Sequence, residues 1–119
     1  MQPEDRNWFH LRQIVRMVAL IEGRLANFDK ATFLTDRNEI DLTSFRLQVI
    51  GEAVRKVSDP IKGRYPEVAW SQIVAMRNFI AHDYEGIDIE RVWSVAKNNL
   101  RELESVCRAE LGTEGLVDL

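Results

Sequence analysis

Three side chains suited to chemistry on a phosphate lie within eight residues of one another: Arg77, His82 and Tyr84. Histidine titrates near neutral pH and can transfer protons. Arginine is permanently charged and can donate two hydrogen bonds to one phosphate. Together they could cleave RNA through its own 2′-hydroxyl. His82 would move the proton and Arg77 would hold the charge that builds on the phosphorane oxygens. Such a reaction needs no metal ion.

The same residue types also have a plainer explanation. A histidine near a helix C-terminus commonly compensates the helix dipole or packs. An arginine five residues earlier can simply pair with a nearby acid. Residue types alone therefore leave both interpretations open.

Helix geometry limits how Arg77 and His82 can cooperate. At about 100° per residue, Arg77 and Tyr84 lie on one face of a helix, while His82 is rotated by roughly 140° from Arg77. Either the helix loosens near His82, or other elements complete the cleft in which Arg77 and His82 would meet one phosphate. Cleavage also needs both a base and an acid, whereas each chain offers one histidine here. Two chains related by a two-fold axis would supply two, so we predict a homodimer.

Apolar residues recur at helical spacing along the chain, and no segment alternates as a strand would. They predict four helices, over roughly residues 5–30, 37–58, 69–82 and 88–111. The first helix carries one unbroken apolar stripe of Leu11, Ile14, Val18, Ile21, Leu25 and Phe28. We therefore expect one all-α domain over residues 1–119. It would be a four-helix up-and-down bundle with a short extra helix or loop between the second and third helices.

Capping residues and glycines add detail on where these helices begin, end and approach one another. Thr35 or Asp36 offers an N-cap for the second helix and Asp88 for the fourth, while Gly112 would end the fourth and leave a frayed tail. Gly51 interrupts the second helix at a cost of roughly 1 kcal/mol against alanine, so a close approach of another helix would explain it. The second helix is predicted to bury Leu42, Phe45, Val49, Ala53 and Val57. The fourth is predicted to bury Ile89, Val92, Trp93, Ala96, Leu100, Leu103, Val106 and Cys107.

The formal net charge of −3 restricts how this chain could bind RNA. Proteins that track long nucleic acids usually carry a basic excess, because phosphate neutralisation supplies much of their affinity. This chain would need a local basic patch or a compact site. The candidate patch contains Arg55, Lys56, Lys62 and Arg64, and an ordinary solvated surface is the alternative explanation.

The sequence favours a cytoplasmic protein without a metal or cofactor. A single cysteine, Cys107, cannot form an internal disulfide and fits a reducing compartment. No apolar run approaches the roughly 20 residues of a membrane span, and residues 1–12 do not read as a secretory signal. The chain has two histidines and one cysteine, far apart in sequence, so no transition-metal site is expected.

Longer stretches around the motif resemble a known family. Residues 77–84 read Arg-Asn-Phe-Ile-Ala-His-Asp-Tyr, which is similar to the Arg-Asn-x3-His-x-Tyr motif of the HepT branch of HEPN ribonucleases. Residues 50–53 resemble that family's Ile-Gly-Glu-Ala, and residues 65–70 its Tyr-Pro-x-x-x-Trp segment. Residues 86–93 resemble the start of its last helix. These ordered blocks span roughly residues 10–110, so the chain resembles a HepT-like toxin with the HEPN fold.

The resemblance implies a role for each motif residue. Arg77 and His82 would be catalytic, with Asn78 orienting a phosphate or the histidine. HepT-like toxins act as homodimers with their motifs facing each other. Their partner is a minimal nucleotidyltransferase (MNT) antitoxin, which transfers AMP from ATP to the motif tyrosine, here Tyr84. AMPylation there would add negative charge and bulk close to His82, where an RNA phosphate must bind.

Individual residues outside the motif have competing explanations. Glu52 could pair with Arg77 and set its orientation, or it could be an ordinary surface carboxylate. Trp70 and Trp93 could stack on a base, although tryptophans of so small a bundle more often belong to the core. Cys107 lies on the apolar stripe of the last helix and is expected to be inert core.

These observations favour a metal-independent endoribonuclease toxin of a HEPN/MNT toxin–antitoxin pair, neutralised by its partner. The alternative is a non-catalytic HEPN dimer that serves as the binding partner of a nucleotidyltransferase. A purely structural bundle is a third possibility, but it leaves the polar motif unexplained.

Overall fold

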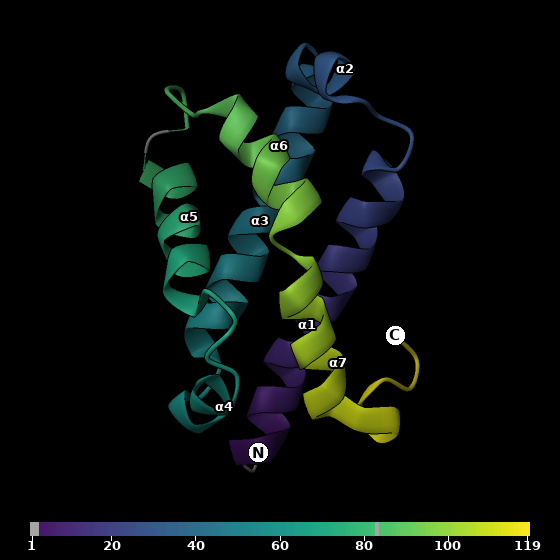
Figure 1. Cartoon of the computed structure of the whole chain (residues 1–119), viewed down its shortest axis with the longest axis vertical. Coiled ribbons are helices and arrows are strands. Elements are labelled where there is room, and N and C mark those ends of the chain that lie inside the picture. Colours follow the sequence, from purple (N-terminus) through teal and green to yellow (C-terminus); the bar gives the residue numbers. More distant parts are fainter. Residues whose placement is uncertain (1–2, 83) are drawn as a thin grey trace.

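The computed structural model describes residues 3–82 and 84–119 (Figure 1). In this part of the chain the helices are α1 (Pro3–Leu25), α2 (Lys30–Leu34), α3 (Arg37–Lys56), α4 (Asp59–Arg64), α5 (Trp70–His82), α6 (Ile89–Asn98) and α7 (Arg101–Gly115). No strand occurs in these residues, so the predicted all-α class is confirmed. No helix among them is long and apolar enough to cross a membrane.

The central helix of the bundle is α3. It packs against α5 on one side and α1 on the other, while α7 packs against α1 and α6 packs against α3 (Figure 1). α5 runs antiparallel to α3, so the end of α5 lies beside the beginning of α3 (Figure 1). This arrangement matters for the site, because both ends of the residue 77–84 motif contact α3.

Two predicted helices differ from those in the structure. The first ends at Leu25 rather than near residue 30, because the Asp29 side chain caps a separate short helix by accepting from the Thr32 N–H at 2.8 Å. The fourth is split into α6 and α7 at Leu100, which nevertheless stays buried. The short helix expected between the second and third helices is α4, whose first turn accommodates Pro60.

The predicted buried face of the second helix is largely wrong. Phe45 is 61% exposed, and Leu42 and Val49 are only partly buried, whereas Ala53 and Val57 are buried as expected. α3 has neighbours on two sides, so its buried surface is broader than one apolar stripe and includes polar positions. Its buried residues are Glu39, Ile40, Thr43, Ser44, Leu47, Ile50, Gly51, Ala53 and Val54.

The caps and the last helix are mostly as predicted. Asp36 and Asp88 both accept a hydrogen bond from a backbone N–H three residues later, at 3.1 and 3.2 Å. Gly112 has a φ of 64°, which interrupts the regular helix where the sequence predicted its end. The tail that was expected to fray contacts α1, since Arg12 Nη1 donates to the carbonyl oxygens of Gly115 at 2.6 Å and Val117 at 2.9 Å.

Candidate active site

The site begins with an unusually close contact between α3 and α5. Gly51 of α3 is buried, and a Cβ added there would lie 2.3 Å from Cβ of Arg77 and 3.3 Å from the carbonyl oxygen of Ile73. No side chain fits at position 51 without moving one of the helices. The close approach expected from Gly51 is therefore present, and Arg77 is the residue that occupies the space.

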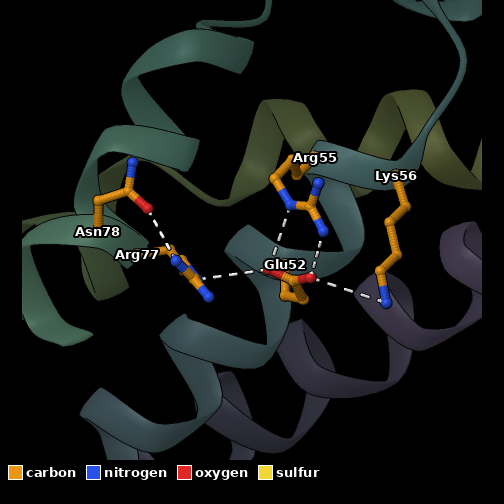
Figure 2. A network of polar contacts seen from close by, with 5 residues as sticks. All are labelled: Glu52, Arg55, Lys56, Arg77 and Asn78. Carbon is orange, nitrogen blue, oxygen red and sulfur yellow. Dashed lines mark hydrogen bonds and ion pairs between the residues drawn. The ribbon is translucent and has the colours of Figure 1, made fainter.

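Arg77 is held by two polar partners. Its Nε lies 3.3 Å from Glu52 Oε2, and its Nη1 donates to Asn78 Oδ1 at 2.9 Å (Figure 2). Of the two explanations left open for Glu52, the structure contains the pair with Arg77. Asn78 contacts the arginine, whereas the resemblance pointed to a phosphate or the histidine.

Glu52 is shared by further cations. Arg55 Nη2 donates to its Oε1 at 2.6 Å, and Lys56 Nζ lies 3.7 Å from the same oxygen (Figure 2). The hydrogen bond from Arg55, together with the positive charges of Arg55, Arg77 and Lys56, lowers the pKa of Glu52. Three cations against one carboxylate leave two positive charges in this cluster, on a chain whose net charge is −3.

The predicted basic patch is thus divided. Arg55 and Lys56 join Arg77, whereas Arg64 pairs with Glu110 of α7 at 2.6 Å. The spacing of Glu52 to Arg55 and Lys56, three and four residues, is a signal in the sequence that could have identified the first group. Nothing local marked the pair of Arg64 with Glu110, which lie 46 residues apart.

His82 is the last residue of α5 and is exposed. α5 is helical through His82 and ends there, so the helical offset between Arg77 and His82 is kept within residues 70–82. Other elements must therefore complete any cleft that uses both Arg77 and His82. Asp83 lies outside the described residues.

The position of Tyr84 differs from the predicted one. α5 ends at His82, so Tyr84 lies beyond the helix and the helical wheel that placed it on the face of Arg77 does not apply. Its hydroxyl donates a hydrogen bond to Asp41 Oδ1 of α3. Arg37, one turn earlier, has its Nε 3.0 Å from the same oxygen and its guanidinium carbon 5.1 Å from the centre of the Tyr84 ring. Sequence reasoning missed both residues.

A groove opens beside Arg77. Its volume is about 400 Å³, and its lining includes Phe9 of α1, Phe45 and Lys56 of α3, and the Arg77–Glu52 pair. Phe9 and Phe45 are 59% and 61% exposed, which is unusual for phenylalanine. The groove therefore places an uncovered apolar surface directly next to the positive cluster.

Other residues considered for chemistry belong to the core. Trp70 is buried, with its indole N–H donating to the Tyr65 carbonyl oxygen at 3.0 Å, and the ring of half-buried Trp93 lies 5.0 Å from that of Phe33. Cys107 is fully buried, and burial raises its pKa to about 12. The thiol therefore stays protonated at neutral pH, as expected of an inert core cysteine. Among the described residues, no three His, Cys, Asp or Glu side chains gather as a metal site would require.

Comparison with known proteins identifies the family of this chain. Residues 14–110 match the sequence model of a family described as Ribonuclease HepT-like. The chain belongs to this HepT-like ribonuclease family. The matched segment contains Glu52, the residue 77–84 motif and both residues that contact Tyr84. The predicted family and the predicted enzyme class, an endoribonuclease, are thereby confirmed.

Individual relatives are more distant. A protein of Thermococcus cleftensis named probable ribonuclease HepT is 27% identical over 95 residues, which cover 80% of this chain and 86% of the relative. A protein of Methanocaldococcus jannaschii described as a candidate RNase is 38% identical over 58 residues. That match covers 49% of this chain and 50% of the relative. No solved structure gave a significant match.

Proposed function

We propose that this HepT-like chain is a metal-independent endoribonuclease in which Arg77 and His82 act on the scissile phosphate of RNA. The observation that carries the proposal is the fixed position of Arg77 within a cluster of excess positive charge. Glu52 engages its Nε and Asn78 its Nη1, so the guanidinium plane is held and its remaining N–H donors can reach a phosphate oxygen. Asn78 is accordingly a positioning residue.

The proposed reaction is an attack of the RNA 2′-hydroxyl on the neighbouring phosphorus, which leaves a 2′,3′-cyclic phosphate. One histidine removes the 2′ proton, and a second proton donor protonates the departing 5′ oxygen. Arg77 stabilises the charge on the phosphorane oxygens. The exposure of His82 at the end of α5 leaves its imidazole accessible to substrate.

The active form in this proposal is a homodimer. A single chain offers one motif histidine, and α5 carries His82 on a different side from Arg77. A second copy would supply the missing acid or base. The exposed Phe9 and Phe45 beside Arg77 give such a copy an apolar surface to cover.

Regulation is proposed to come from an MNT antitoxin that transfers AMP from ATP to Tyr84. The half-buried Tyr84 lies two residues from His82. A phosphodiester and an adenosine attached there would compete with RNA for the motif by charge and bulk. The chain would then be the toxin of a toxin–antitoxin pair.

Expression in bacteria without the partner tests the enzymatic proposal. Wild type should arrest growth and degrade RNA, while Arg77→Ala and His82→Ala should be harmless. With purified protein in EDTA, we expect cleavage to fall about 10²–10³-fold for Arg77→Ala and about 10²–10⁴-fold for His82→Ala. Arg101→Ala, which removes an exposed arginine from the start of α7, is the matched control and should cleave like wild type.

The opposite outcome would point to the non-catalytic alternative. A wild-type protein that leaves growth and RNA unaffected, yet binds a nucleotidyltransferase, would be an adaptor. Cleavage that requires an added metal ion would contradict the proposed chemistry.

A further inference from the structure

Tyr84 belongs to a small charged network at the beginning of α3. Its hydroxyl donates to Asp41 Oδ1, and Arg37 Nε lies 3.0 Å from that same oxygen. The guanidinium of Arg37 also lies over the tyrosine ring, 5.1 Å from its centre. Because α5 runs antiparallel to α3, the segment after α5 meets the first turns of α3, which carry both charged residues (Figure 1).

This network is open to solvent. The side chains of Arg37 and Asp41 are 57% and 50% exposed, and Tyr84 is half-buried. A co-substrate as large as a nucleoside triphosphate can therefore approach the hydroxyl without rearrangement of the core. The pair of Arg37 and Asp41 resembles an ordinary i,i+4 surface pair in sequence, but Tyr84 makes it a three-residue arrangement.

We propose that Asp41 is the general base for nucleotide transfer to Tyr84 and that Arg37 stabilises the charge that develops during the transfer. The inference rests on the proposed function, in which a nucleotidyltransferase presents ATP. Tyr84 Oη forms a bond to the α-phosphorus, and the bond from that phosphorus to the pyrophosphate oxygen breaks. The phenolic proton passes to Asp41, which then releases it to water, and pyrophosphate leaves with the electron pair.

The geometry suits a base for two reasons. A tyrosine hydroxyl has a pKa of about 10 and is almost entirely protonated at neutral pH, so a proton acceptor accelerates its attack. Because Tyr84 donates its hydrogen to Asp41, the oxygen lone pairs are left for the phosphorus. A carboxylate is a weak base, so the proton moves as the new bond forms and the hydroxyl becomes more acidic. General bases of this kind contribute about 10²–10⁴-fold.

Arg37 can act both during the transfer and after it. A guanidinium over an aromatic face is attracted to the ring, and the attraction increases as the oxygen gains negative charge. After transfer, Tyr84 carries a phosphodiester with one negative charge beside the Asp41 carboxylate. Arg37 contacts both residues and offsets the repulsion between these two anions.

The test is the rate of nucleotide addition to the purified full chain. It is followed by intact mass with the MNT partner and ATP. Asp41→Asn keeps an oxygen that can accept from Tyr84 but cannot take its proton, so we expect addition at least tenfold slower. Arg37→Gln should also be slower, and Tyr84→Phe should gain nothing. Asp59→Asn, which changes an exposed aspartate at the start of α4, is the matched control and should behave like wild type.

The pH dependence separates a base from a structural anchor. The ratio of the wild-type rate to the Asp41→Asn rate cancels the titration of the transferase itself. This ratio should fall toward one near pH 10, since an ionised tyrosine needs no base. The other charged groups beside Tyr84 are Arg37 of α3 and, in sequence, His82, Asp83 and Glu85. All four are present in both proteins, so the ratio reports on Asp41.

Each outcome has a distinct meaning. Equal rates for Asp41→Asn and wild type would overturn the assignment of Asp41 and leave the proposed function standing. A wild type that gains no nucleotide would overturn the proposed regulation and this inference with it. A defect of the same size at every pH, accompanied by slower RNA cleavage, would give Asp41 an anchoring role and overturn the role as base.

Discussion

Replacing Gly51 by alanine would force apart the two helices that position Arg77. The added Cβ would lie 2.3 Å from Arg77 Cβ, whereas nonbonded carbon atoms rest at about 3.5–4.0 Å. α3 and α5 must therefore separate locally by roughly 1.2 Å or more. A change of rotamer gives no relief, because the Cβ of Arg77 is attached directly to the backbone of α5.

The effect on stability has two parts of opposite sign. Overpacking of a well-packed interface costs about 1–3 kcal/mol, and alanine gains about 1 kcal/mol over glycine in a helix interior. The clash involves backbone-linked atoms, so the upper part of the first range applies. We expect the free energy of unfolding to fall by about 1–2 kcal/mol. RNA cleavage should fall more steeply, since a displacement of about 1 Å at a catalytic group can cost about 10²-fold.

The measurement pairs urea denaturation, followed by circular dichroism, with initial rates of RNA cleavage. Gly23→Ala is the matched control, because Gly23 lies near the end of α1 and a Cβ there meets nothing within 4 Å. This control should be more stable by up to about 1 kcal/mol and should cleave normally. If Gly51→Ala matches Gly23→Ala in both measurements, the close approach of α3 and α5 does not require glycine and the reasoning is refuted.

Two other perturbations address the proposed dimer and the core. Phe45→Glu puts a charge into the groove beside Arg77. Light scattering should then show a monomer, circular dichroism should show unchanged helical content, and a dimer that persists would place the interface elsewhere. Cys107 should resist iodoacetamide at pH 8 until the protein is unfolded, and rapid alkylation of the folded protein would contradict its burial. Because its folded pKa is about 12, the unfolded thiol ionises first as pH rises above 9. Relative to Cys107→Ala, the free energy of unfolding of wild type should therefore fall by roughly 1.4 kcal/mol per pH unit in that range.

Local patterns in the sequence identified most of the helices but not their breaks. Capping residues such as Asp36 and Asp88 act through neighbours three residues away, so their effect is readable in sequence. The division at Leu100 was missed because its side chain stays buried and the apolar stripe continues across it. The orientation of Phe45 was also missed. Which side of α3 is covered depends on how α1 and α5 pack around it, and the stripe does not contain that information.

The candidate active site was predictable to the same extent. The residue 77–84 motif is contiguous, and Glu52 lies in a short recognisable block, so both could be found without a structure. Asp41 is 43 residues from Tyr84, and their contact depends on the antiparallel register of α3 and α5. It also depends on α5 ending at His82, because a longer helix would have carried Tyr84 away along the helical wheel. Neither condition leaves a pattern in the residues themselves.

The charge distribution reconciles an acidic chain with chemistry on RNA. Nonspecific attraction to RNA grows with the number of phosphates neutralised, and a net charge of −3 opposes it. The cluster around Glu52 retains two positive charges, so it offers RNA a local attraction beside Arg77. Glu52 contributes by holding Arg55, Lys56 and Arg77 together despite their mutual repulsion. A substrate phosphate would meet cations already gathered in place, and an AMP group on Tyr84 would add an anion near the same motif.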